Sequence, residues 1–162
     1  CIYFIKDVEG CKKLGLDPEK GILLSGPVGC GKTSLMKLLP YFVPYQKRYE
    51  IMPARKIAFQ FNNQGFGAIE QYGNNGYYCF DDLGVELGGH HYAKECNVMG
   101  EILLSRYDLF SHLEPRKRVK THITTNLNAE ELEKRYGTRV RSRLREMMNV
   151  IAFDNNSIDK RQ

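Results

Sequence analysis

The chain has 162 residues, of which 42% are hydrophobic and 27% charged, and its formal net charge at pH 7 is +5. This length and this balance of residues suit one domain with a full hydrophobic core. No apolar run approaches the length of a membrane span, so we expect no membrane contact. The positive charge favours an acidic partner such as nucleic acid.

The cysteines predict a reducing compartment. They are five, an odd number, and they are scattered without a C-x-x-C pair, so a disulfide framework is not expected. We therefore expect a cytoplasmic protein. Because the chain begins at Cys1 rather than Met, we also expect it to be a piece of a longer protein, and a missing signal peptide then says little about location.

Residues 1–20 form the expected lead-in to the domain. Val8, Cys11 and Leu14 have the spacing of one face of a short helix. This segment carries no chemical motif, and only its position suggests that Tyr3–Ile5 contact an adenine base.

A glycine-rich loop carries the first chemical signal. It follows the apolar strand Ile22–Leu24 and has the form Gly26-x-x-x-x-Gly31-Lys32-Thr33, which fits the phosphate-binding P-loop at every fixed position. The glycines let successive N–H groups point at one anion, the lysine adds charge near the β- and γ-phosphates, and the threonine hydroxyl can ligate Mg²⁺. A plain glycine-rich turn is the disfavoured alternative, because strand, loop and helix occur in the required order. The expected nucleotide-binding residues are Gly26, Pro27, Val28, Gly29, Cys30, Gly31, Lys32, Thr33 and Ser34.

The helix after this loop is expected over residues 32–39, with Pro40 and Pro44 bracketing its end. Its N-terminus directs the positive end of the helix dipole at the phosphate site. The next expected elements are a strand over 49–52 and helices over 54–61 and 67–72.

Two carboxylates follow the next apolar strand, Tyr77–Phe80. A P-loop NTPase needs its Walker B acids at this point. Asp81 would hold Mg²⁺, and Asp82 would orient or deprotonate the attacking water. The alternative is a strand that ends in a polar turn, where Asp is common, but the complete P-loop upstream favours the functional interpretation.

Residues 84–94 are polar and rich in glycine, which predicts a loop. His90, His91 and Cys96 suggest a zinc site at first sight, but no fourth ligand lies at a plausible spacing, so a solvated loop is favoured. A helix is expected over 97–110.

The strand over residues 119–126 has a polar tip. Asn126 at that tip can hold the attacking water near the γ-phosphate. Alternatively it only opens a turn, because Asn128 and Glu131 have the spacing of a capping box that starts the next helix without any chemistry.

An arginine-rich stretch over residues 136–146 follows. Arg139 and Arg143 are four apart and would share a helix face, while Val140 and Leu144 occupy another. From the residues alone, an ordinary charged helix face is the default interpretation. A last strand over 149–153 closes the sheet, and residues 154–162 form a polar tail.

Strands alternate with helices along the chain, which predicts an α/β fold with a mostly parallel five-stranded sheet and helices on both faces. Residues 21–153 resemble the AAA+ ATPase core, and more narrowly the DnaC/IstB-like group of helicase loaders and transposition helpers. The matching stretches are Gly-Pro-Val-Gly-Cys-Gly-Lys-Thr at 26–33, Phe-Asp-Asp-Leu-Gly at 80–84, Thr-Thr-Asn-Leu-Asn at 124–128 and Tyr-Gly-Thr-Arg-Val-Arg-Ser-Arg-Leu at 136–144. The paired Asp81-Asp82, in place of the Asp-Glu pair common in other AAA+ proteins, is similar to the pair that DnaA and DnaC relatives carry.

The resemblance implies a three-layer P-loop NTPase core of the AAA+ type without a full C-terminal lid, since only nine residues follow Phe153. It gives Asn126 the sensor 1 role. It also makes Arg143 the arginine finger, with Arg139 as an accompanying basic residue. Such a finger enters the ATP site of a neighbouring subunit.

Motifs and resemblance together predict an ATPase that uses ATP and Mg²⁺, self-associates through an intersubunit ATP site, and helps to load a replicative helicase or to direct transposition with a transposase. Single-stranded DNA is a further expected partner. The basic cluster at 116–120 would touch its phosphates, although a solvated basic loop explains this cluster equally well. Two alternatives stay open: a small-molecule P-loop kinase, which needs an acceptor pocket and usually an arginine-rich lid, and a nucleotide-gated binding module without hydrolysis.

Overall fold

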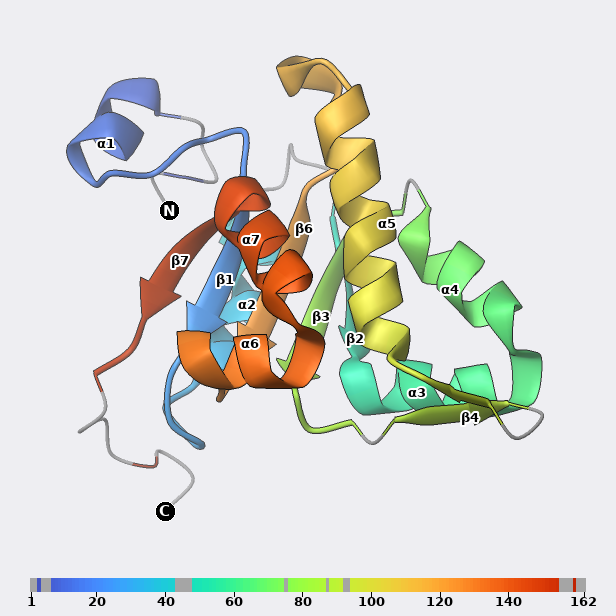
Figure 1. The fold of residues 1–162 in the computed structure, drawn as a ribbon. Helices are drawn as coiled ribbons and strands as arrows, with labels where there is room; N and C mark the ends of the chain where they lie inside the picture. The colour runs from blue at the N-terminus through green and yellow to red at the C-terminus, as the bar shows by residue number, and fades with distance from the viewer. Residues whose placement is uncertain are drawn as a thin grey trace.

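The structure of the chain is a computed structural model that describes residues 3, 7–42, 48–74, 76–86, 88–91, 94–154 and 159. Its centre is a five-stranded sheet with the order β2-β3-β6-β1-β7, and every neighbouring pair is parallel (Figure 1). The strands are β1 (Gly21–Ser25), β2 (Glu50–Pro53), β3 (Tyr78–Leu83), β6 (Thr121–Thr125) and β7 (Met148–Ala152). The predicted α/β fold with a parallel sheet is confirmed.

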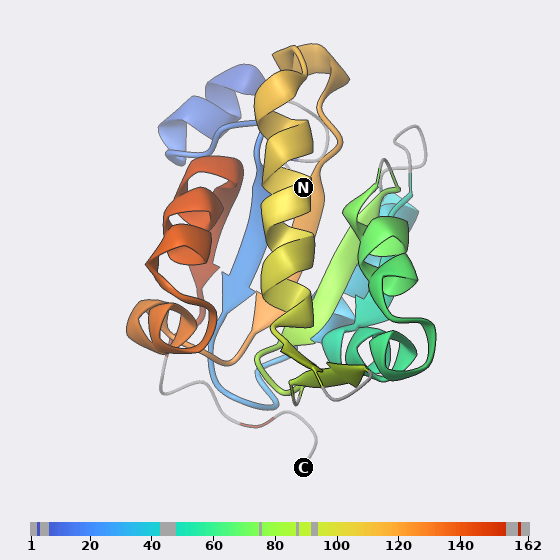
Figure 2. The same ribbon diagram turned by 45° about the vertical axis from the view of Figure 1, so that its right-hand side comes forward.

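Helices cover both faces of this sheet and complete the predicted three layers. Figure 2 shows α5 crossing in front of the strands, with α6 and α7 on one side of it and α3 and α4 on the other, whereas α2 lies behind the sheet in Figure 1. The helices are α1 (Val8–Lys13), α2 (Lys32–Phe42), α3 (Ala54–Gln64), α4 (Phe66–Gly73), α5 (Val98–His112), α6 (Ala129–Tyr136) and α7 (Thr138–Met147), with a 3₁₀ turn at Pro115–Lys117. No helix among the described residues is long and apolar enough to cross a bilayer.

The apolar strands are buried on both faces, as parallel strands between two helical layers must be. Leu23 and Ile123 point into the front core with α5 and α7, whereas Ile22 and Leu24 point into the back core with Met36 of α2. The predicted run at the start of the P-loop motif is therefore a central strand that contributes to both cores.

Helix α2 continues three residues beyond the expected range of 32–39 and ends at Phe42, between the two prolines, Pro40 and Pro44, that were expected to bracket its end. Pro40 has no N–H to give to the carbonyl of Met36, four residues earlier. The hydroxyl of Tyr49 donates a hydrogen bond to that carbonyl instead, at 2.5 Å. This side chain supplies the missing donor, and the helix tolerates the proline. Pro44 lies outside the described residues.

The short helix expected in the lead-in is present as α1. Cys11 is fully buried, but Val8 and Leu14 are 51% and 60% exposed, because α1 touches the back core at one point only. The predicted loop over 84–94 contains part of a small antiparallel hairpin, β4 (Gly89–His91) with β5 (Lys94–Cys96). Phe61 and Val98 lie so close to Gly89 that an added Cβ would come within 2.6 Å of both.

The sequence also suggested, at first sight, a metal site at His90, His91 and Cys96. Within the ranges that the structure describes, no three His, Cys, Asp or Glu residues come together in a way that would hold a metal ion. The cysteines at positions 11, 30, 79 and 96 are free thiols. The polar tail predicted over 154–162 lies outside the described residues apart from positions 154 and 159.

His122 on β6 gives the fold a testable dependence on pH. Its Nδ1 accepts the N–H of Ile22 at 3.2 Å, and the rings of Tyr3 and Tyr49 pack on it. Burial, aided by Lys120 and Arg106, lowers the pKa of His122 from 6.5 to about 3. Because the unfolded chain binds the proton below pH 6.5 and the folded chain does not, this histidine stabilises the fold above pH 6.5 and loses that contribution as the pH falls towards 3.

We therefore expect the free energy of unfolding to fall by about 2 kcal/mol from pH 7 to pH 5 through His122 alone. Urea unfolding at several pH values measures it. The control is His122→Asn, which keeps an acceptor for the N–H of Ile22 but does not titrate. Equal pH dependence in wild type and variant would contradict the prediction.

Candidate functional site

The predicted site residues meet at the carboxyl edge of the sheet. The P-loop follows β1, the two aspartates end β3, and Asn126 follows β6. These three strands are neighbours in the order β3-β6-β1, so their ends converge (Figure 1). In open α/β sheets, ligands bind in the crevice outside this edge.

The P-loop wraps around the ammonium group of Lys32. Its Nζ donates to the carbonyl oxygens of Gly26 and Pro27, both at 2.8 Å, and to Oδ1 of Asn126 at 2.7 Å. The residue is only 5% exposed, and no acidic side chain in the described part of the chain pairs with it. Cys30 Sγ lies 3.7 Å from the same Nζ. A buried charge held only by neutral groups is costly, so this ammonium is suited to receive an anion.

The backbone of the loop prepares the same place for an anion. Gly29 and Gly31 have φ values of +80° and +98°, in the left-handed region that favours glycine. Helix α2 begins at Lys32, and its first N–H groups and the positive end of its dipole face the loop. Lysine, loop and helix end thus combine as the sequence predicts.

Asp81 joins the P-loop helix to the strand edge through hydroxyl groups. Its Oδ1 accepts from the hydroxyls of Thr33 at 2.8 Å and Thr124 at 2.6 Å, and the residue is 7% exposed. Mg²⁺ in nucleotide sites is held by one or two carboxylates, hydroxyls and the phosphates of the substrate. The buried Asp81 carboxylate beside the Thr33 hydroxyl supplies that set of hard oxygens, so these residues fit Mg²⁺.

Asp82 is placed by an irregularity of β3. The register with β6 shifts between Phe80 and Leu83, and Asp82 has φ +53°, the sole positive value among the non-glycine residues that the structure describes. Its N–H donates to the hydroxyl of Thr124 at 2.9 Å, which fixes the strained turn. A bulge re-aims a side chain, and here it brings Asp82 to the wall of the P-loop cavity.

That cavity has a volume of about 470 Å³ and a mixed lining. The P-loop with Lys32, Asp82 and Asn126 supplies its polar groups, and Leu38 and Phe153 are among its apolar side chains. From the sequence, Leu38 and Phe153 belong only to a helix and a strand, and no motif marks them as site residues. Leu38 is 54% exposed on α2, and Phe153 reaches the cavity because β7 lies beside β1.

The positional guess for the adenine contact is wrong where it can be checked. Tyr3 is 5% exposed, belongs to the back core and donates a hydrogen bond to the carbonyl of Lys20. It does not line the cavity. Residues 4 and 5 lie outside the described ranges.

The two predicted arginines lie on α7 and do not line the cavity. The guanidinium of Arg143 stacks 4.2 Å over the ring centroid of Tyr107, donates to the Tyr107 hydroxyl at 3.0 Å and lies 3.7 Å from Glu146. Its side chain is 37% exposed. Arg139 is exposed, with no partner among the residues that the structure describes.

Comparisons with known proteins support the fold. No family model matches the sequence. A segment of 39 residues, 24% of the chain, is 49% identical to the proteasome-activating nucleotidases of Pyrococcus abyssi and Thermococcus onnurineus, and it spans 10% of the length of those proteins.

Solved structures are similar over nearly the whole chain. The DnaC helicase loader aligns with a TM-score of 0.61 and 19% identity, over 95% of this chain and 92% of that one. A candidate primosome component from Streptococcus pyogenes serotype M3 aligns with a TM-score of 0.60 and 19% identity, over 96% of this chain and 79% of that one. The chain therefore shares the fold of these two solved structures, among them the DnaC helicase loader.

Proposed function

We propose that this protein binds and hydrolyses ATP with Mg²⁺ and assembles through that site. The observation that carries the proposal is the buried ammonium of Lys32, which has no acidic partner in the described chain and lies beside the start of α2. The residue types around it match the parts that phosphoryl transfer requires.

Each residue of the cavity then has one task. The P-loop amides and Lys32 bind the phosphates, and the carbonyls of Gly26 and Pro27 that now hold the ammonium give way to them. Thr33 and Asp81 would hold Mg²⁺, and the ion would supply positive charge to the phosphate oxygens. Asp82 would accept a proton from the attacking water or orient it, with Asn126 as a second polar group in the cavity.

The apolar side chains that line the cavity suit a nucleoside base. Leu38 and Phe153 lie on the same cavity as the phosphate-binding loop, and Phe153 packs so closely on Gly26 that a Cβ there would lie 2.7 Å from it. Pockets for such ligands combine apolar walls with a few fixed polar groups. These two side chains would contact the adenine and the ribose.

The cavity is incomplete for rapid hydrolysis within one chain. Lys32 is the one basic side chain among the described residues that line it. We infer that a neighbouring subunit supplies the missing guanidinium from α7, with Arg143 as the finger and Arg139 beside it. ATP would then time the association of subunits, as a device for loading a replicative helicase or for directing a transposase.

The same lining favours hydrolysis over the two alternatives. A small-molecule kinase would need an acceptor pocket and usually an arginine-rich lid over the phosphates, whereas Lys32 is the one basic side chain among the described residues that line this cavity. A binding module without hydrolysis would not need the strained Asp82, which costs folding free energy.

The proposal includes contact of the basic cluster at 116–120 with single-stranded DNA. Lys117 pairs with Glu114 at 3.1 Å, Arg118 stacks 4.0 Å over the ring centroid of Phe110, and Lys120 donates to a backbone carbonyl. DNA would compete with these contacts, and its affinity should fall steeply with salt if phosphates are bound.

The test is phosphate release from Mg-ATP over a range of protein concentrations, with and without single-stranded DNA. We expect turnover per chain to rise with protein concentration, because each site needs a second subunit, and to vanish in Lys32→Ala. ATP binding without phosphate release at any protein concentration would indicate a nucleotide-gated binding module without hydrolysis. A phosphorylated small molecule would indicate a kinase.

A further inference from the structure

A buried glutamate lies just beyond the carboxyl edge of the sheet and has no part in the proposed chemistry. Glu86 is 5% exposed and follows the turn that begins with Asp82. Its two carboxylate oxygens and its carbonyl are all engaged. Because a buried carboxylate is costly unless it is fully bonded, its position between two elements asks for an explanation.

One oxygen of Glu86 holds the Walker B turn. Oε2 accepts the N–H of Gly84 at 2.8 Å. Gly84 has φ +103°, and an added Cβ would lie 2.5 Å from Leu127, the residue after Asn126. Glu86 is therefore bonded to a turn that begins at Asp82 and that the side chain of Leu127, the neighbour of Asn126, contacts directly.

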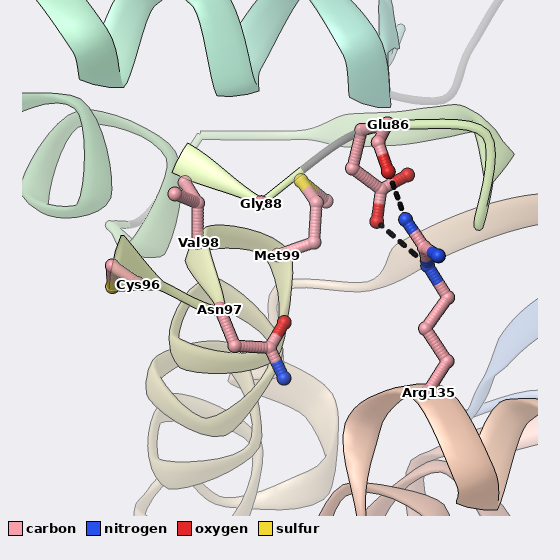
Figure 3. A pocket seen from close by; sticks show the side chains of 7 residues that line it. All are labelled: Glu86, Gly88, Cys96, Asn97, Val98, Met99 and Arg135. Atoms are coloured by element: carbon pink, nitrogen blue, oxygen red, sulfur yellow. Dashed lines mark hydrogen bonds and ion pairs between the residues drawn. The ribbon is translucent and has the colours of Figure 1, made fainter. Parts of the chain in front are cut away.

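The rest of Glu86 holds the last turn of α6. Oε1 accepts a hydrogen bond from the hydroxyl of Tyr136. The same oxygen lies 3.7 Å from Nε of Arg135, whose Nη2 donates to the Glu86 carbonyl (Figure 3). Burial and the Glu86 carboxylate raise the pKa of Tyr136, so its hydroxyl stays a donor. Gly137 alone separates this turn from α7, whose second residue is Arg139, the first of the two arginines.

An open space adjoins this bridge. A cavity of about 400 Å³ is lined by Glu86 and Arg135 on one side and by Asn97 and Met99 at the start of α5 on the other, and Figure 3 shows Arg135 reaching across from α6. A purely structural support would be closely packed. Here the ion pair borders free volume into which Arg135 can move.

We propose that Glu86 is a positioning residue that transmits the state of the nucleotide site to α6 and α7. The inference rests on the proposed function, since it names how ATP would reach the arginines of the subunit contact. The carboxylate ties the turn after Asp82 to the helix end before Gly137, so that both move together.

A tryptophan on α7 makes the coupling visible. The chain contains no tryptophan, and Ser142 is exposed on α7, so Ser142→Trp is a single fluorescent reporter. With a non-hydrolysable ATP analogue and Mg²⁺, we expect its emission to change in the otherwise wild-type chain. In Glu86→Gln, we expect the Kd of the analogue to stay within about twofold, most of the emission change to vanish, and turnover at saturating ATP to fall about tenfold.

Two further variants separate coupling from folding. Glu133→Gln on α6 removes the acidic partner of Arg141 and leaves Glu86 intact. This variant should keep both the emission change and the turnover of the wild type. Tyr136→Phe removes one contact of Glu86 and should lose part of the emission change with a thermal midpoint close to the wild type.

A full emission change and wild-type turnover in Glu86→Gln would overturn the inference, as would a wild-type reporter that stays silent while the analogue binds. Failure of the proposed function is a different result. There the wild type binds no ATP analogue at all, and the inference falls with it.

Discussion

Replacing Asp82 by asparagine is expected to lower the rate of ATP hydrolysis about a thousandfold, while ATP affinity stays within about threefold. Asp82 lines the cavity beside Lys32 and Asn126, where an attacking water would lie, and the contacts that hold Asp81 come from Thr33 and Thr124. Removing the charge of Asp82 therefore removes a proton acceptor and leaves the residues for phosphate and Mg²⁺ in place.

Asparagine is the informative substitution because of the backbone. Asp82 has φ +53°, a conformation that asparagine also adopts readily, whereas alanine would add strain to the turn. Single-turnover hydrolysis and binding of a fluorescent ATP analogue measure the two quantities separately. The matched control is Asp81→Asn, in which Mg²⁺-dependent binding should weaken as well. Hydrolysis by Asp82→Asn within tenfold of the wild type would exclude this residue as the water-activating group.

The parts of the site that are local in sequence could be predicted. The P-loop is a continuous pattern in which glycine conformation, lysine and threonine have fixed spacings, and Asp81 and Asp82 follow a strand directly. Parallel strands end at the same edge of a sheet, so the three predicted strand ends were expected to lie close together. In the structure, Nζ of Lys32 and Oδ1 of Asn126 are 2.7 Å apart.

The parts that depend on contacts between distant segments could not. Pro40 remains helical because Tyr49 satisfies the carbonyl of Met36, and nothing near Pro40 in the sequence shows that contact. The hairpin of β4 and β5 packs on a distant part of the chain, because Gly89 lies against Phe61 of α3. Glu86 follows a predicted motif by two residues, but its bonds to Arg135 and Tyr136 span about fifty positions.

Arg143 carries the second large prediction. Arg143→Ala is expected to lower the turnover of the assembled protein at least about a hundredfold without changing ATP affinity, because an arginine finger stabilises charge that develops only in the transition state. In the chain itself Arg143 rests on Tyr107, is 37% exposed and lies outside its own ATP cavity. Arg139→Ala, a charge removal on the same helix, should cost less than tenfold. Thermal unfolding checks that loss of the Tyr107 contact leaves the fold intact.

Mixing two inactive variants decides whether the arginine acts on a neighbour. Arg143→Ala keeps an intact ATP cavity, and Asp82→Asn keeps an intact arginine. In a head-to-tail assembly with random mixing of equal amounts, about one site in four combines an intact cavity with an intact arginine from the next subunit, so about a quarter of wild-type turnover should return. If Arg143 acted within its own chain, no site in the mixture would be complete, and turnover would stay at the level of the separate variants. Recovery in the mixture, together with its dependence on total protein concentration, would therefore place the finger of one subunit at the cavity of the next.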